Sequence, residues 1–252
     1  MRLGICGGLD IAERAREAGF DYIEVGASGF ALREDFDPEE YKRAGAEASN
    51  LFFPGTIHLQ GPNATPYHDY LETVIARGAA IGLKVMVIGS GASRKAPEGV
   101  NLDEADERFV EIAAEAQEVA NRYGIPIAPE SLNRSETNVG NDMGDLAREL
   151  QAMGVAYTAD SYHIVYEWNA DGGEGEPDWV GQIPFLPEHV HVSNLDRKAP
   201  TPDDPLMQGF FSRLRDLGYK GRVSLEANLP DLTVETLRAV RNNLAALASV
   251  LD

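Results

Sequence analysis

Hydrophobic and polar positions repeat one pattern along the chain: an amphipathic helical stretch, a glycine, and a short apolar run that ends in a polar residue. The glycines of five copies are Gly19, Gly82, Gly124, Gly154 and Gly218. Glycine readily adopts the left-handed conformation that ends a helix, and β-prone residues follow it at once in every copy. The pattern therefore predicts helices that alternate with strands, which is typical of a parallel sheet with helical crossovers.

Separate signals mark where helices and strands begin. Asp10 and Asp37 each precede a glutamate by three residues, the spacing of a capping box, and Pro38 suits the first helical position. Residues 102–122 carry their apolar side chains on one face of a long helix. We predict strands over residues 2–6, 55–59 and 190–194, among eight strands that start near residues 2, 21, 55, 84, 125, 155, 189 and 222.

Eight alternating units of strand and helix predict that the sheet closes on itself. The expected fold is α/β, with a single (β/α)8 TIM barrel domain over residues 1–252. The alternative is an open, doubly wound sheet, which commonly carries a glycine-rich dinucleotide fingerprint after its first strand. Gly7 and Gly8 lack that GxGxxG spacing, so we favour the barrel.

Composition and charge exclude several kinds of partner. The chain has 43% hydrophobic residues and a formal net charge of −19, and its basic residues cluster only in pairs. Such a charge would repel a nucleic acid, and no apolar run reaches the roughly 18 residues of a membrane span. No export signal precedes Asp10, and the lone Cys6 cannot form an internal disulfide. We therefore expect a cytoplasmic protein that binds neither nucleic acid nor membrane.

Polar residues end four successive predicted strands. They are Glu130, Asp160, His191 and Glu226, separated by 30, 31 and 35 residues, one βα unit each. Strand ends meet at one mouth of a barrel, and carboxylates gathered there repel one another unless a cation lies among them. Three carboxylates and an imidazole suit Mn²⁺, Mg²⁺ or Co²⁺, whereas a structural zinc site prefers cysteine. The sequence predicts one divalent metal site, with Mn²⁺ favoured.

Other polar residues near strand ends have more than one interpretation. We expect His189 and His191, which share one predicted strand, to face opposite sides of it, so that only one side chain faces the mouth and the other packs or caps. His58 could lie beside the site or be structural. The glycine-rich residues 88–95, which include Arg94 and Lys95, could cradle a phosphate or simply form a loop flanking the mouth.

Four segments around these residues resemble the ketose 3-epimerases, within the xylose isomerase-like, sugar phosphate isomerase/epimerase superfamily. The segments are residues 130–137 (ESLNRSET), 160–163 (DSYH), 191–197 (HVSNLDR) and 221–226 (GRVSLE). The resemblance covers roughly residues 124–229, and the first half of the chain resembles the wider superfamily only in outline. That superfamily also contains isomerases, dehydratases and C-glycoside-cleaving lyases, so the resemblance indicates the site more closely than the reaction.

The resemblance implies a role for each matching residue. Glu130, Asp160, His191 and Glu226 would bind the metal, and Glu130 and Glu226 would also act as the catalytic acid/base pair on opposite faces of a sugar. Substrate oxygens would be bound by Glu136, His163 and Arg197.

The implied reaction is inversion of the carbon next to the carbonyl of a ketose or related keto-polyol, through a metal-stabilised enediolate. The alternative is a metal-dependent lyase or dehydratase that acts on a keto-sugar, cyclitol or C-glycoside. The expected partner is a small-molecule sugar, and a homo-oligomer is compatible with the sequence. Residues 6–10 form an unusually short first βα segment without an aromatic residue, so Phe30, Tyr162 or Trp168 could provide the aromatic wall that this segment usually brings.

Overall fold

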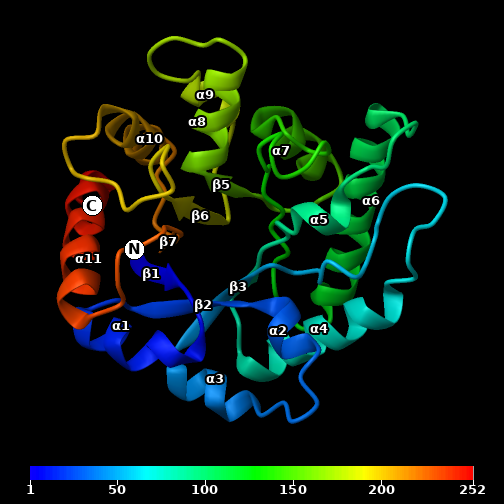
Figure 1. The fold of residues 1–252 in the computed structure, drawn as a ribbon, viewed down its shortest axis with the longest axis horizontal. Coiled ribbons are helices and arrows are strands. Elements are labelled where there is room, and N and C mark those ends of the chain that lie inside the picture. The colour runs from blue at the N-terminus through cyan, green and yellow to red at the C-terminus, as the bar shows by residue number, and fades with distance from the viewer. Residues whose placement is uncertain (252) are drawn as a thin grey trace.

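The computed structural model describes residues 1–251, in which seven parallel strands form one sheet in the order β4-β3-β2-β1-β7-β6-β5 (Figure 1). The strands are β1 (Arg2–Cys6), β2 (Tyr22–Gly26), β3 (Ala46–Asn50), β4 (Val85–Met86), β5 (Thr158–Asp160), β6 (His189–Val192) and β7 (Arg222–Leu225). Their parallel pairing follows from the helical crossovers that connect them.

An eighth extended segment, residues 126–130, closes this sheet into a barrel. Its Ile127 pairs with Met86 of β4 and its Glu130 pairs with Thr158 of β5, each through an isolated bridge. The segment contains Pro126 and Pro129, which have no backbone N–H to donate, so a continuous ladder cannot form. The predicted (β/α)8 barrel is thereby confirmed, with its fifth strand reduced to two bridges.

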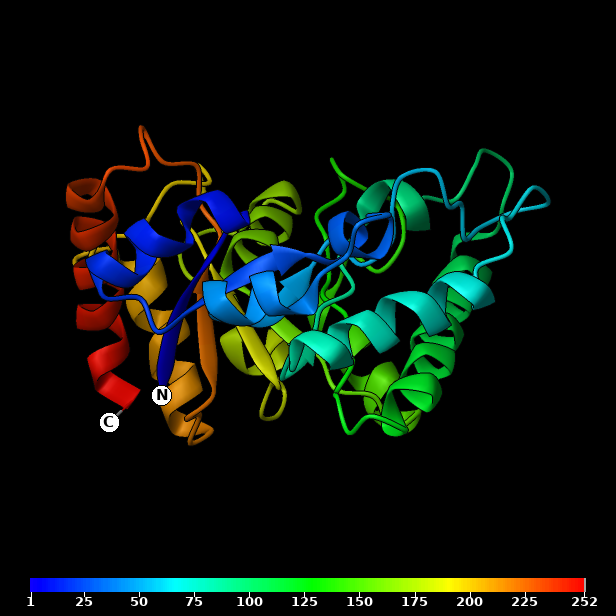
Figure 2. The ribbon, with the colours of Figure 1, turned by 90° about the horizontal axis from the view of Figure 1, so that it is seen from below.

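Helices surround the strands, and α1 and α11 lie side by side in both views (Figures 1 and 2). Their bounds are α1 (Ala12–Ala18), α2 (Ala27–Ala31), α3 (Pro38–Ala44), α4 (His68–Ile81), α5 (Gly91–Arg94), α6 (Leu102–Asn121), α7 (Met143–Ala152), α8 (Ser161–Ala170), α9 (Trp179–Gln182), α10 (Pro205–Asp216) and α11 (Val234–Ala248), with short 3-10 helices at Leu9–Ile11 and Ser249–Leu251. None of the helices in residues 1–251 has the length and apolarity needed to cross a membrane.

The glycine pattern is confirmed, because all five predicted helix-ending glycines have a positive φ, between 66° and 99°. The predicted long helix is α6, and the Asp37 side chain caps α3 by accepting from the Glu39 N–H at 3.0 Å. The expected cap at Asp10 is wrong, since a 3-10 turn that begins at Leu9 precedes α1 and no side-chain cap bond forms there.

The predicted third strand is also wrong. Residues 55–59 form a loop, and β3 is Ala46–Asn50 instead. This strand reads Ala-Glu-Ala-Ser-Asn and has no run of large apolar residues to reveal it. Small residues are needed because Ala48 faces the barrel interior, where the Tyr22 ring already fills the space.

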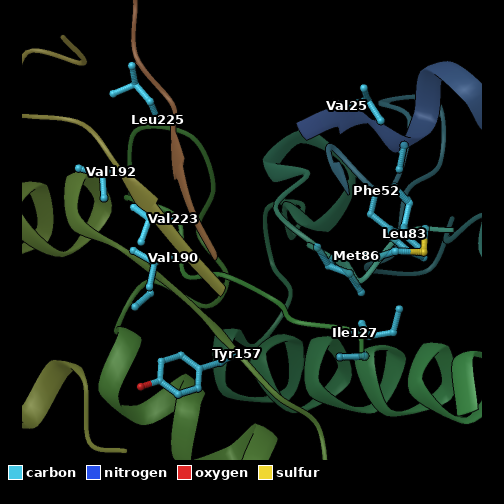
Figure 3. Close-up of a cluster of buried hydrophobic side chains, with 14 of the residues drawn as sticks. Val25, Phe52, Leu83, Met86, Ile127, Tyr157, Val190, Val192, Val223 and Leu225 are labelled. Carbon is cyan, nitrogen blue, oxygen red and sulfur yellow. The ribbon is translucent and has the colours of Figure 1, made fainter. Parts of the chain in front are cut away.

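Apolar and polar residues alternate along β6, so one face packs against helices and the other lines the barrel interior. Val190 and Val192 belong to the large core between strands and helices (Figure 3). His189 and His191 share the opposite face, since residues two apart on a strand point the same way. The expectation that they face opposite sides of the strand is therefore wrong, because both imidazoles contact Glu24 inside the barrel.

Candidate metal centre

The barrel brings the four predicted metal ligands together at the carboxyl ends of neighbouring strands. Glu130 ends the bridging segment and Asp160 ends β5. His191 lies in β6, and Glu226 directly follows β7. One ligand atom from each residue lies within 4.8 Å of the others. His191 Nδ1 is 2.9 Å from Glu130 Oε2, 3.2 Å from Glu226 Oε2 and 4.0 Å from Asp160 Oδ2.

These residues fit a divalent cation. Asp160 uses Oδ1 to cap α8 by accepting from the Tyr162 N–H at 2.7 Å, so its Oδ2 is left free. Asp160 Oδ2 and Glu226 Oε2 are buried and accept no hydrogen bond of good geometry among residues 1–251, although His191 Nδ1 and Arg197 Nη1 each lie 3.2 Å from Glu226 Oε2. A Cβ on Gly89 would collide with Glu130 Oε1, so the glycine leaves room for that carboxylate. Oxygen-rich donors with one imidazole suit hard or intermediate divalent ions.

The carboxylates have pKa values displaced in different directions. Burial raises the pKa of Asp160 to about 6, and the nearby Glu226 charge adds to this. Burial also raises the pKa of Glu130. For Glu226, the His191 and Arg197 charges outweigh the effect of burial and lower the pKa to about 2. An ionised Glu226 thus faces a Glu130 that holds a proton more readily, a separation typical of acid/base pairs.

The surrounding charges also displace the pKa of His191. Burial alone would lower its pKa, but the surrounding carboxylates, Glu24 first, outweigh burial and raise the pKa well above its usual value. The centre therefore has a strongly negative potential at the His191 ring, which attracts a proton or a metal cation to the same point.

The three residues predicted to bind substrate lie at the edge of the same centre. Arg197 Nη1 is 3.2 Å from Glu226 Oε2, and its Nη2 is 3.5 Å from Glu136 Oε1. Arg197 has a φ of 57°, a strained conformation that is often found at functional sites. It borders a cavity of about 300 Å³ whose other lining residues are Cys6, Glu226, Ala227 and Asn228.

His163 is buried and held in one tautomer. Its Nδ1 lies 3.0 Å from the backbone N–H of Asn133 and therefore accepts that hydrogen bond. Burial lowers the pKa of His163 to about 4, so the ring is neutral and Nε2 carries the proton. That N–H lies 3.6 Å from Asp160 Oδ2, where it can donate to a bound oxygen.

Of the three aromatic residues considered for the cavity wall, Tyr162 contacts Arg197, which lines the cavity. The Arg197 guanidinium stacks over the Tyr162 ring at 4.2 Å. Phe30 is completely buried and packs against Phe36 and Tyr41, which rules it out as a wall. Trp168 packs closely over Gly173 at the end of α8.

The alternative of a phosphate cradle in residues 88–95 is not supported, because Arg94 and Lys95 do not face one site. Arg94 is fully buried over the Phe109 ring at 4.5 Å, and its Nη1 donates to the Glu130 carbonyl oxygen at 2.8 Å. Lys95 lines a different cavity of about 640 Å³, together with His58, which is exposed. Arg94 therefore supports the backbone of a predicted ligand and does not face solvent.

Glu24, the carboxylate beneath the centre, was not predicted from the sequence. Glu24 is completely buried in β2 and contacts both His189 and His191 at 2.8 Å. The two imidazoles outweigh the effect of burial and hold the pKa of Glu24 well below its usual range. The available signal was a single acid inside the apolar run Tyr22-Ile23-Glu24-Val25, because a charge there requires a buried partner.

Comparisons with known proteins agree with this geometry. Residues 12–247 match the family model described as the xylose isomerase-like TIM barrel, and the chain belongs to this family. No curated protein sequence matches the chain.

Similar solved structures include a D-psicose 3-epimerase, which is 21% identical with a TM-score of 0.80 over 100% of this chain and 99% of that chain. A 3-keto-D-glucoside 4-epimerase from E. coli is 21% identical with a TM-score of 0.74, over 99% of each chain. An L-ribulose 3-epimerase is 17% identical with a TM-score of 0.75, over 99% of this chain and 95% of that chain. At these identities the likeness establishes the shared fold.

Proposed function

We propose that the protein is a divalent-metal-dependent sugar epimerase, which inverts the carbon next to the carbonyl of a ketose or related keto-polyol. The observation that carries this proposal is the relation between Glu130 and Glu226. Both carboxylates approach the same nitrogen, His191 Nδ1, yet their pKa values are displaced in opposite directions. The centre thus combines one base and one acid beside a single cation site.

Each residue has a defined task in this reaction. A metal held by Glu130, Asp160, His191 and Glu226 would polarise the substrate carbonyl and make the adjacent C–H more acidic. Glu226, which is ionised, removes that proton. Glu130, whose pKa is raised by burial, returns a proton to the opposite face of the same carbon and so inverts it.

The remaining polar residues orient the sugar. Arg197 and the Nε2–H of His163 donate to substrate oxygens, while Glu136 accepts from a hydroxyl group. Arg197 lines a cavity of about 300 Å³, a size that suits a small polyol, and Glu136 and His163 lie beside its guanidinium.

A metal-dependent lyase or dehydratase, acting on a keto-sugar, cyclitol or C-glycoside, is the second candidate. The observation that favours it is the short first βα segment, which is only a 3-10 turn at Leu9–Ile11. Cys6, rather than an aromatic side chain, lines the cavity there. A substrate with a bulkier substituent could therefore enter on this side.

Turnover in D₂O with Mn²⁺ separates these reactions across a panel of ketoses, inososes and keto-glycosides. The epimerase mechanism predicts deuterium on the carbon next to the carbonyl, with product mass otherwise unchanged. Glu226→Gln keeps a ligand oxygen but is no longer basic, so it should bind Mn²⁺ and lose exchange. Rapid epimerisation without solvent deuterium, or an active Glu226→Gln enzyme, would refute the two-glutamate mechanism. A new product mass would indicate the lyase or dehydratase.

A further inference from the structure

Beneath the metal centre lies a buried hydrogen-bonded group that the proposed reaction does not use. Glu24 extends from β2 into the barrel interior and shares its carboxylate between two imidazoles of β6. Its Oε1 is 2.8 Å from His191 Nε2, and its Oε2 is 2.8 Å from His189 Nε2. All three side chains are completely buried. Barrel interiors are commonly filled by bulky apolar side chains, so this polar layer requires an explanation.

The bond between Glu24 and His191 determines which nitrogen faces the cation site. An ionised carboxylate only accepts hydrogen bonds, so the proton must lie on Nε2 of His191. The unprotonated lone pair of the neutral ring is then on Nδ1, the nitrogen that lies 2.9 Å from Glu130 Oε2. Glu24 thereby selects one tautomer and one ring orientation.

Ser224 and Tyr22 form a chain of hydrogen bonds that fixes the Glu24 carboxylate. Ser224 Oγ donates to Glu24 Oε2 at 2.5 Å, so the hydroxyl of Tyr22, 2.8 Å away, must be the donor to Ser224. A Cβ on Gly4 would collide with the Tyr22 ring, which explains the glycine at that position. This chain of donors occupies Oε2 and leaves Oε1 for His191.

We propose that Glu24 is a positioning residue of the metal centre, which presents Nδ1 of His191 to the cation. Carboxylates that accept from the second nitrogen of a ligating histidine fix its tautomer and increase its basicity, and their loss weakens metal binding by about 10–100-fold. A purely structural role for this group would affect folding stability without this specific effect on the metal. The inference rests on the proposed metal function, and the test keeps the two distinguishable.

The test compares the wild type with Glu24→Leu, Glu24→Gln and a control, Thr158→Val. Thr158 is completely buried in β5 and its side chain donates to the Ala128 carbonyl at 2.8 Å, so the control also loses a buried side-chain hydrogen bond, while the backbone pairing of Thr158 with Glu130 does not depend on that side chain. Two measurements are made on each protein: Mn²⁺ affinity by calorimetry, and ¹⁵N-histidine NMR of the His191 Nε2–H without metal and with Mg²⁺. Thermal unfolding without metal measures the stability change separately.

We expect a slowly exchanging Nε2–H on His191 in the wild type and its loss in Glu24→Leu. Mn²⁺ binding should weaken by about 10–100-fold in Glu24→Leu. Glu24→Gln retains an oxygen that accepts from Nε2–H, so we expect that signal to remain and the affinity loss to lie near the lower end of this range. Thr158→Val should lose stability and bind Mn²⁺ as the wild type does. If Glu24→Leu does not fold, Glu24→Gln and the control carry the comparison.

Wild-type Mn²⁺ affinity in both Glu24 variants would overturn the inference. Losses of Mn²⁺ affinity that follow the losses of thermal stability in all three variants, Thr158→Val included, would overturn it too. A wild-type His191 without a proton on Nε2 would overturn it as well. A wild-type protein that binds no divalent cation would refute the proposed function, while the NMR signal would still decide whether Glu24 sets the tautomer.

Discussion

Gly89→Ala is a substitution that should move a predicted metal ligand without removing it. Gly89 is buried three residues after the end of β4, and its φ lies outside the positive region, so the backbone permits alanine. A Cβ there would fall well inside 3.0 Å of Glu130 Oε1 and lie 3.3 Å from Glu130 Cδ. To regain an ordinary contact, the carboxylate must move by about 1 Å.

A displacement of this size has a defined kinetic consequence. A misplacement of about 1 Å in a reacting group can reduce the rate by about 10²-fold. We therefore expect Gly89→Ala to lose about two orders of magnitude in kcat/KM and to bind Mn²⁺ more weakly. Its free energy of unfolding should fall by only about 1–3 kcal/mol, the usual cost of overpacking.

The matched control is Gly26→Ala, at the end of β2 on the same mouth of the barrel. Gly26 has a φ of −68°, and the nearest atom to its added Cβ would be Leu51 Cδ1 at 3.8 Å, an ordinary contact. Calorimetric Mn²⁺ titration and steady-state kinetics on both variants test the reasoning. Wild-type affinity and turnover in Gly89→Ala, or equal losses in the two variants, would refute the role of Glu130.

Three further predictions concern the same centre. Chelation should abolish activity and Mn²⁺ or Co²⁺ should restore it, because the donors are oxygen-rich and lack thiolate; full turnover by protein that elemental analysis shows to be metal-free would contradict this. Arg197→Ala and His163→Ala should retain the metal and lose kcat/KM, whereas loss of metal would make the residue a ligand. Metal affinity should rise with pH, because burial raises the pKa of Asp160 to about 6 and a cation must also displace the proton on His191, whose pKa is raised further. Calorimetry at several pH values, with proton release measured in buffers of different ionisation enthalpy, checks the sign; affinity independent of pH would contradict it.

The fold could be predicted because its signals are local. A glycine that ends a helix acts through its own φ, and five such positions mark the repeat without knowledge of distant contacts. Strand β3 escaped prediction because its sequence is determined by a distant residue: Ala48 must be small where Tyr22 fills the interior. The expected cap at Asp10 failed for a related reason, since the chain there enters a 3-10 turn rather than an α-helix.

The predicted ligands came together because each ends its own βα unit, and a barrel necessarily gathers those ends at one mouth. The prediction for His189 and His191 was wrong because side chains two residues apart on a strand point to the same face. Glu24 has no comparable motif, because it acts through the imidazole of a strand more than 160 residues further along the chain.

Glu24 and Gly89, both in the first half of the chain, act on the predicted ligands indirectly. Gly89 matters through the side chain that it lacks, and Glu24 matters through the oxygen that contacts His191 Nε2. Neither residue lines the cavity of about 300 Å³ beside Arg197. Changes at Glu24 should therefore weaken metal affinity while KM at saturating Mn²⁺ stays close to the wild-type value, whereas Arg197→Ala should raise KM at unchanged metal affinity. Steady-state kinetics over a matrix of Mn²⁺ and substrate concentrations would separate the two effects. A KM increase in Glu24→Gln that persists at saturating Mn²⁺ would contradict this expectation and show that Glu24 also affects how the sugar binds.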